Sequence, residues 1–80
     1  MDAAFEKILK KIAELDENFE IKSNQLLIED LDIDSLRLID LVLQIEGEYE
    51  IELNEDALAN ARTVEALWVE ITRAKDLINA

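Results

Sequence analysis

The segment 35–49 has the pattern that most constrains the fold of this chain. Its polar side chains recur every three or four residues and form a narrow stripe of Arg37, Asp40, Gln44 and Glu48. Apolar residues fill most of the other positions, which predicts an α-helix with a wider apolar arc than one core contact requires. We therefore expect a helix that is central in a bundle, or one that turns part of its apolar face toward a partner or ligand.

Apolar residues at helical spacing predict two further long helices. One covers residues 2–15, and its buried stripe is expected to contain Phe5, Ile8, Leu9, Ile12 and Leu15. The last helix begins after Thr63 as its N-cap, and its buried face is expected to contain Val64, Leu67, Trp68, Ile71 and Ile78. Tyr49 and Trp68 are interpreted as core or core-edge residues.

A short helix over 55–60, after Asn54 as its N-cap, completes the predicted elements. Only residues 49–53 alternate like a strand, and they are too few to build a sheet. The chain therefore predicts one all-α domain, a small bundle of three main helices plus one short helix. The apolar, acid-rich loop of residues 16–34 should be held against the core, and its length is typical of a functional loop.

Composition excludes several classes of function. The 80 residues contain no Cys and no His, so the chain offers no thiol nucleophile, no disulfide and no imidazole base. Its formal net charge of -12 opposes binding to nucleic acid and to an anionic membrane, and favours partners with basic patches. With no evident signal peptide and no apolar run of spanning length, we expect a cytoplasmic protein. We also expect it to be a monomer.

Ser35 stands where the apolar loop meets the helix of residues 35–49. A helix N-terminus favours a phosphate group, so a phosphodiester on Ser35 would suit this position, although Asp34 or Ser35 could simply cap the helix. The alternation of acids from Asp30 imitates a calcium loop, but Ser35 and Leu41 occupy the positions that require Gly and Glu. We expect no dedicated metal site and no enzyme activity.

The residues around Ser35 resemble the acyl carrier proteins, and the likeness extends over essentially the whole chain. It rests on Asp34-Ser35-Leu36 opening an apolar helix with an acidic stripe. Four further segments support it with family-like spacing: Ile39-Asp40-Leu41-Val42, Ile45-Glu46, Tyr49-Glu50-Ile51-Glu52-Leu53 and Ala61-Arg62-Thr63-Val64. The resemblance implies a single acyl carrier domain over residues 1–80, with a long loop between the first and second helices.

The resemblance also implies a function and its residues. A phosphopantetheinyl transferase would attach 4′-phosphopantetheine from coenzyme A to Ser35, with Asp34 used in recognition by the transferase. The thiol of this group would hold acyl intermediates as thioesters, which the protein would carry between enzymes of fatty-acid, polyketide or related specialised biosynthesis. The implied surface for acyl-loading and acyl-processing enzymes with basic docking patches is formed by Leu36, Arg37, Asp40, Leu43 and Glu46.

Some residues depart from the family pattern. Asp32 replaces a common Gly, Asn54 replaces a common Pro, and Arg37 occupies a position that is usually acidic in fatty-acid carriers. We expect Arg37 to weaken the acidic stripe near Asp40, which favours a specialised pathway. Gly47 interrupts a Glu-rich stretch and is expected to mark helix fraying or a close contact.

Two other interpretations remain open on the sequence. A carrier of aminoacyl, aryl or peptidyl units, of the D-alanyl or nonribosomal type, would use the same attached group. An acidic helical interaction module would need no attached group, and it would keep its function after Ser35→Ala.

Overall fold

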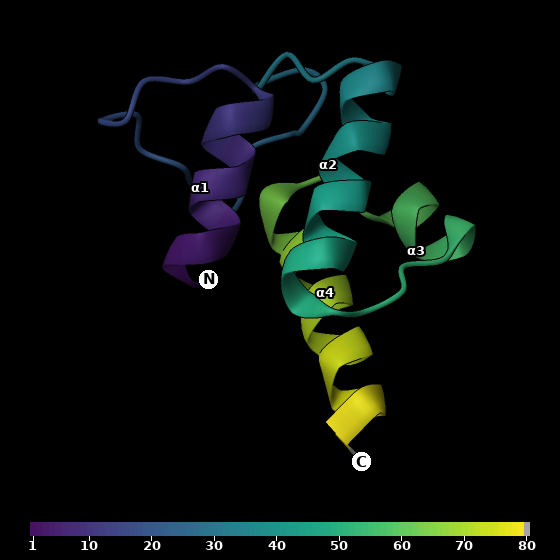
Figure 1. Cartoon of the computed structure of the whole chain (residues 1–80). Coiled ribbons are helices and arrows are strands. Elements are labelled where there is room, and N and C mark those ends of the chain that lie inside the picture. Colours follow the sequence, from purple (N-terminus) through teal and green to yellow (C-terminus); the bar gives the residue numbers. More distant parts are fainter. Residues whose placement is uncertain (80) are drawn as a thin grey trace.

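The computed structural model describes residues 1–79 and every side chain in that range except those at positions 55, 57, 78 and 79. Four helices follow one another: α1 (Ala3–Ile12), α2 (Ser35–Tyr49), α3 (Glu55–Asn60) and α4 (Val64–Asn79). Figure 1 shows the long loop between α1 and α2 and the short α3 beside α2. The prediction of three main helices and one short helix is confirmed, while the predicted core position of Ile78 lies outside the described side chains.

α1 ends at Ile12, three residues earlier than the apolar spacing predicted. Glu14 adopts the left-handed conformation, with φ of 55°. The Leu15 N–H donates to the Lys10 carbonyl at 2.8 Å and the Glu14 N–H to the Lys11 carbonyl at 3.3 Å, which are the two bonds of a Schellman motif. Leu15 still packs against the core, so the apolar spacing continues past the point where the helix stops.

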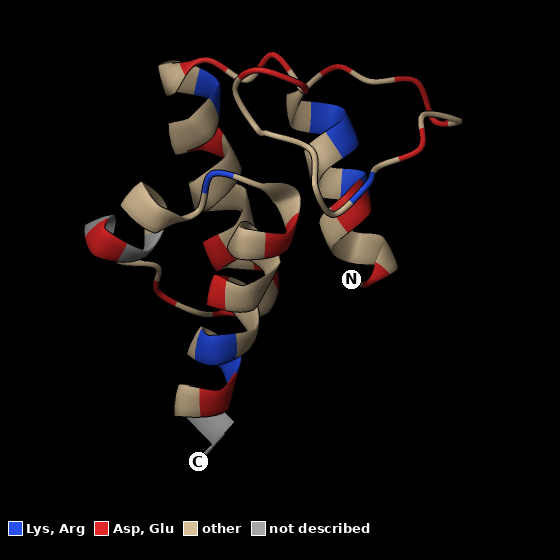
Figure 2. Ribbon diagram, turned by 180° about the vertical axis from the view of Figure 1, so that it is seen from behind, with Lys and Arg blue, Asp and Glu red and all other residues tan. Residues whose placement is uncertain are grey.

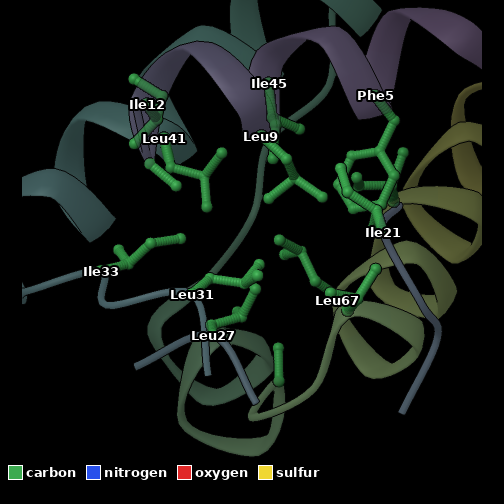
Figure 3. Close-up of a cluster of buried hydrophobic side chains, with 14 of the residues drawn as sticks. Phe5, Leu9, Ile12, Ile21, Leu27, Leu31, Ile33, Leu41, Ile45 and Leu67 are labelled. Atoms are coloured by element: carbon green, nitrogen blue, oxygen red, sulfur yellow. The ribbon is translucent and has the colours of Figure 1, made fainter. Parts of the chain in front are cut away.

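One hydrophobic core joins the helices and the loop, and α1 packs along α2. Figure 3 shows side chains of α1, α2 and α4 meeting those of the loop in this core. No polar or charged side chain is buried among those the structure describes. The largest fully buried side chains are Phe5, Leu9, Leu27, Leu31, Ile33, Leu41, Ile45, Leu67, Ile71 and Val64.

The loop between α1 and α2 is held against the start of α4, as its apolar composition predicted. The Leu27 N–H donates to the Arg62 carbonyl at 3.0 Å, and the Val64 N–H donates to the Gln25 carbonyl at 3.0 Å. Ile21, Leu27, Leu31 and Ile33 point into the core and are buried. The loop therefore has both a backbone attachment and an apolar anchor, which fixes the direction from which the chain enters α2.

A polar and aromatic cluster joins the start of α1 to the end of α2 and the middle of α4. Asp2 is the N-cap of α1, and its Oδ1 accepts hydrogen bonds from the Phe5 N–H at 2.9 Å and the Tyr49 hydroxyl at 2.6 Å. The Trp68 ring lies 5.1 Å from the Phe5 ring and 6.2 Å from the Tyr49 ring. The Lys75 Nζ lies 5.1 Å from the Tyr49 ring centroid. Tyr49 and Trp68 are half-buried, so the core-edge prediction for both is confirmed.

The bond between Asp2 and Tyr49 should make stability depend on pH. The hydrogen bond from Tyr49 lowers the pKa of Asp2, so ionised Asp2 stabilises the fold above about pH 4. This contribution is lost as pH falls through the lowered pKa. Asp2→Asn keeps a capping side chain but removes the charge, so we predict that it is less stable than the wild type at neutral pH and that the difference narrows near pH 3. Urea unfolding at the two pH values measures this, and an unchanged difference would contradict it.

Gly47 should be a site where a substitution stabilises the fold. It lies inside α2 without a positive φ, and an added Cβ would meet no atom within 4 Å. Neither fraying nor a close contact within the chain is found at Gly47, because α2 continues to Tyr49 and the space is open. We predict that Gly47→Ala raises the free energy of unfolding by about 1 kcal/mol, because alanine loses less backbone entropy. Urea unfolding measures this free energy. If Gly47→Ala lowered it, then glycine would be required at this position for a reason other than packing.

Candidate functional site

Ser35 is the first residue of α2, and Asp34 is its N-cap. The Asp34 backbone is extended, its Oδ1 accepts from the Arg37 N–H at 2.8 Å, and its carbonyl accepts from the Leu38 N–H at 2.9 Å. Of the two residues expected as possible caps, Asp34 therefore has that role. The Ser35 side chain is exposed, and its hydroxyl makes no hydrogen bond with the residues that the structure describes.

The residues before Ser35 hold it in place through alternating burial. Leu31 and Ile33 are buried in the core. Asp32, which lies between them, and Asp34, which follows Ile33, are exposed. Asp32 has a φ of 56°, in the left-handed region that favours glycine and that Asp tolerates better than most residues. This conformation gives a physical reason for the Gly that is common there in the family.

Apolar side chains extend the exposed surface from Ser35 along α2. Leu36 is 79% exposed, Ile39 is 59% exposed and Leu43 is 61% exposed, and Asp40 lies exposed among them. The wide apolar arc of α2 therefore faces both the core and the outer surface, so the helix is not buried on all sides. The prediction of site residues omitted Ile39, although its spacing of three from Leu36 and four from Leu43 was a signal for the same face.

A small hollow lies beside this surface, between α2 and α3. It has a volume of about 170 Å³ and is lined by Leu38, Ile39, Val42, Leu43 and Leu58. All five side chains are apolar, so the hollow can take up an apolar group but offers no side-chain hydrogen bond. Leu38 and Ile39 lie three and four residues after Ser35, which places them on the same side of the helix as Ser35.

Two residues of the predicted partner surface are turned toward other parts of the chain. Arg37 Nη2 lies 3.0 Å from Glu14 Oε2, so its charge is paired with the second residue after α1. Glu46 Oε2 accepts a hydrogen bond from the Leu53 N–H at 2.9 Å and is half-buried. Both residues hold loop segments to α2, and their contact with a partner stays a prediction. The expected weakening of the acidic stripe by Arg37 is reduced by its pairing with Glu14.

Two substitutions of Asp34 can distinguish the effect of its capping hydrogen bond from the effect of its charge. We predict that Asp34→Ala lowers the free energy of unfolding by about 1 kcal/mol, because the Arg37 N–H loses its partner. Asp34→Asn should stay close to the wild type, since Asn is an equally good N-cap. Urea unfolding of both variants checks this. An Asp34→Asn variant as unstable as Asp34→Ala would mean that the charge, and not the hydrogen bond, stabilises α2.

The family model for the phosphopantetheine attachment site matches residues 3–68 of this chain. The chain belongs to the acyl carrier protein family. The acyl-carrier-like fold implied by the resemblance is therefore confirmed. Proteins of this family are carriers and not enzymes, and this domain is the site of covalent attachment of 4′-phosphopantetheine. They interact with a phosphopantetheinyl transferase and with biosynthetic enzymes.

Relatives of this acyl carrier protein are found in mycobacteria. The meromycolate extension acyl carrier protein of Mycolicibacterium smegmatis is 33% identical over 70 residues, which is 80% of this chain and 71% of that protein. Its counterpart in Mycobacterium tuberculosis is 34% identical over 70 residues, which is 80% of this chain and 61% of that protein. A solved structure from Mycobacterium tuberculosis, assigned as an acyl carrier protein, has a TM-score of 0.80 and 27% identity, covering 88% of this chain and 92% of that one.

No helix among the described residues is both long and apolar enough to cross a membrane. Within the same residues, no group of three or more acidic side chains is arranged to hold a metal ion.

Proposed function

We propose that Ser35 is the residue to which 4′-phosphopantetheine is attached, with Asp34 contributing to recognition by the transferase. The proposal rests on the Ser35 hydroxyl at the first position of α2, which has no hydrogen-bond partner among the described residues. Because Asp34 supplies the cap, the Ser35 hydroxyl is not required to stabilise the helix. It is therefore available to attack the phosphate of coenzyme A that is attached to pantetheine. The new ester bond forms at Ser35 Oγ, the diphosphate bond of coenzyme A breaks and adenosine 3′,5′-bisphosphate leaves, while the transferase takes up the hydroxyl proton.

The surroundings of Ser35 fit a phosphodiester. The first N–H groups of a helix have no partner within the helix, and the positive end of the helix dipole favours an anion. Ser35 is exposed, so a transferase can approach it without unfolding the loop. The bound group supplies a thiol for thioester chemistry, which this chain has no Cys to provide. The role of Ser35 and Asp34 is to hold the attachment point at the surface, at a fixed end of α2.

The cargo is proposed to be an acyl group in a lipid-related or similarly specialised biosynthetic pathway. The five apolar side chains around the hollow between α2 and α3 can shelter an aliphatic or aryl group. They provide no partner for the ammonium group of an aminoacyl unit, which disfavours the D-alanyl and nonribosomal alternatives. The relatives named for meromycolate extension support a lipid pathway.

The partner enzymes are proposed to carry basic docking patches with an apolar contact at their centre. Leu36 and Leu43 would provide the apolar contacts of the carrier, with Asp40 as the charged contact between them. Such contacts should be fast and sensitive to salt, because exposed charges are screened. We propose that the carrier acts as a monomer in the cytoplasm, where coenzyme A and these enzymes are present.

Intact mass spectrometry tests the attachment site. The apo protein is incubated with coenzyme A and a broad-specificity phosphopantetheinyl transferase, and peptide fragmentation then locates the added mass. We expect one phosphopantetheine, on Ser35. No added mass on protein shown to be folded, or addition at Ser23, would contradict the proposal, and the first result would favour the acidic interaction module.

The proposed cargo has a separate test. The same transferase can load the protein from butyryl-coenzyme A or from a coenzyme A thioester of alanine. We expect the butyryl group to shift the methyl NMR signals of Leu38, Val42 and Leu58, and the alanyl group to leave them near their positions in the holo protein. Equal shifts, or larger shifts with alanine, would favour an aminoacyl carrier.

A further inference from the structure

A groove runs between α1 and the C-terminal half of α2, away from Ser35. It has a volume of about 590 Å³, with Lys7, Ile8 and Lys11 on its α1 side and Gly47 and Glu48 on its α2 side. Because an α-helix rises about 1.5 Å per residue, Gly47 lies about 18 Å from Ser35 along α2. A molecule in this groove would therefore leave the start of α2 accessible.

No contact or backbone conformation within the chain requires a glycine at position 47. Its backbone is helical, and a Cβ at this position would point into the open groove without touching another atom. Almost any other residue would make α2 more stable, because glycine has a low helix propensity. The missing side chain does, however, allow a neighbouring element to approach the α2 backbone closely. A close contact with another protein would explain why a glycine stands at this position.

The α1 side of the groove carries lysines that have no ionic partner among the described side chains. α1 contains three of the eight basic residues of this acidic chain and opposes them with Glu6 alone, and Figure 2 shows blue segments gathered on it. Lys7 and Lys11 are exposed and lie one turn apart, so their charges repel each other. Neither forms an ion pair with the side chains that the structure describes. Lys10 differs, because its Nζ donates to the Glu17 carbonyl at 2.7 Å.

We propose that this groove is a second docking surface, which binds an acidic amphipathic helix of a partner protein. The partner helix would place apolar side chains over Ile8 and Gly47 and carboxylates beside Lys7 and Lys11, in the helix-in-groove mode of recognition. Glu48 on the opposite side favours a basic residue at the other edge of the partner helix. This arrangement relieves the repulsion between the lysines and uses the space that Gly47 leaves open.

The overall charge argues against other occupants. Each copy of the chain has a formal net charge of -12, so two copies repel each other, as do the chain and a nucleic acid or an anionic membrane. A short helical segment avoids this repulsion, because its carboxylates contact only the lysine side of the groove. Charges farther away than about 8 Å are largely screened at physiological salt.

Selection from a displayed library of helical peptides tests the proposal. The folded carrier is the target, and a Gly47→Gln variant, whose side chain projects into the groove, removes peptides that bind elsewhere. We expect the recovered peptides to have one apolar face bordered by Asp or Glu. The dissociation constant of a recovered synthetic peptide should rise at least about tenfold with Lys7→Glu/Lys11→Glu, and should change little with Lys22→Glu, an exposed charge reversal outside the groove.

Three results would overturn this proposal. Recovered peptides without acidic residues would contradict it, as would a failure to recover any peptide that distinguishes the wild type from Gly47→Gln. Self-association in sedimentation experiments that Gly47→Gln abolishes would identify the groove as an interface between copies of the chain. Circular dichroism confirms that each variant is folded. Ser35→Ala should bind the peptide as the wild type does, because Ser35 lies outside the groove. A failure of peptide binding can therefore be distinguished from a failure of attachment at Ser35.

Discussion

Ser35→Ala is expected to abolish attachment of 4′-phosphopantetheine while leaving the fold unchanged. The structure separates these two effects, because Asp34 makes the capping hydrogen bond and the Ser35 hydroxyl makes none with the described residues. Alanine also has a higher helix propensity than serine. The free energy of unfolding should therefore stay within about 0.5 kcal/mol of the wild type, as for surface substitutions in general. Intact mass measures the attachment, and urea unfolding measures the stability.

Ser23→Ala is the matched control, because Ser23 is the other serine of the chain and is also exposed. Its backbone carbonyl accepts from the Glu65 N–H at 2.9 Å, and this bond survives the loss of the hydroxyl. The control should accept one phosphopantetheine as the wild type does. If Ser35→Ala were loaded, or if it unfolded, then the Ser35 hydroxyl would not have the role that its geometry indicates.

The periodicity of apolar residues was sufficient to predict the helices and most of the core. Phe5, Leu9 and Ile12 are buried as predicted, because a stripe at helical spacing has to face the core. The end of α1 was not predictable in this way. The chain reverses at Glu14 through a left-handed residue, and no glycine at this position signals the reversal.

The candidate site was predictable to different degrees. The start of α2 at Ser35 could be located, because Asp34 is a strong capping residue before a long apolar helix. The directions of the Arg37 and Glu46 side chains could not be predicted. Their partners, Glu14 and Leu53, come close to them only when the loops fold. Their charges suggested an outward role, while the structure gives both an intramolecular contact.

Phe5→Ala is expected to remove a large part of the stability of the domain. Phe5 is fully buried, and its ring lies 5.1 Å from that of Trp68, so it joins α1 to α4. Replacing a buried Phe with Ala costs about 3–5 kcal/mol, whereas a domain of this size has a total stability of about 4–12 kcal/mol. Thermal and urea unfolding, followed by circular dichroism, should therefore show a large decrease in the melting temperature and in the free energy of unfolding.

Leu77→Ala is the control for Phe5→Ala, because Leu77 is also an apolar residue on a helix but is 77% exposed. Its substitution should change the free energy of unfolding by less than about 0.5 kcal/mol. A similar loss in both variants would show that the contact between α1 and α4 does not control stability. Attachment to Ser35 provides a second readout. Because Ser35 is held by the loop that packs on the same core, Phe5→Ala should slow attachment, and conditions that refold the variant should restore it.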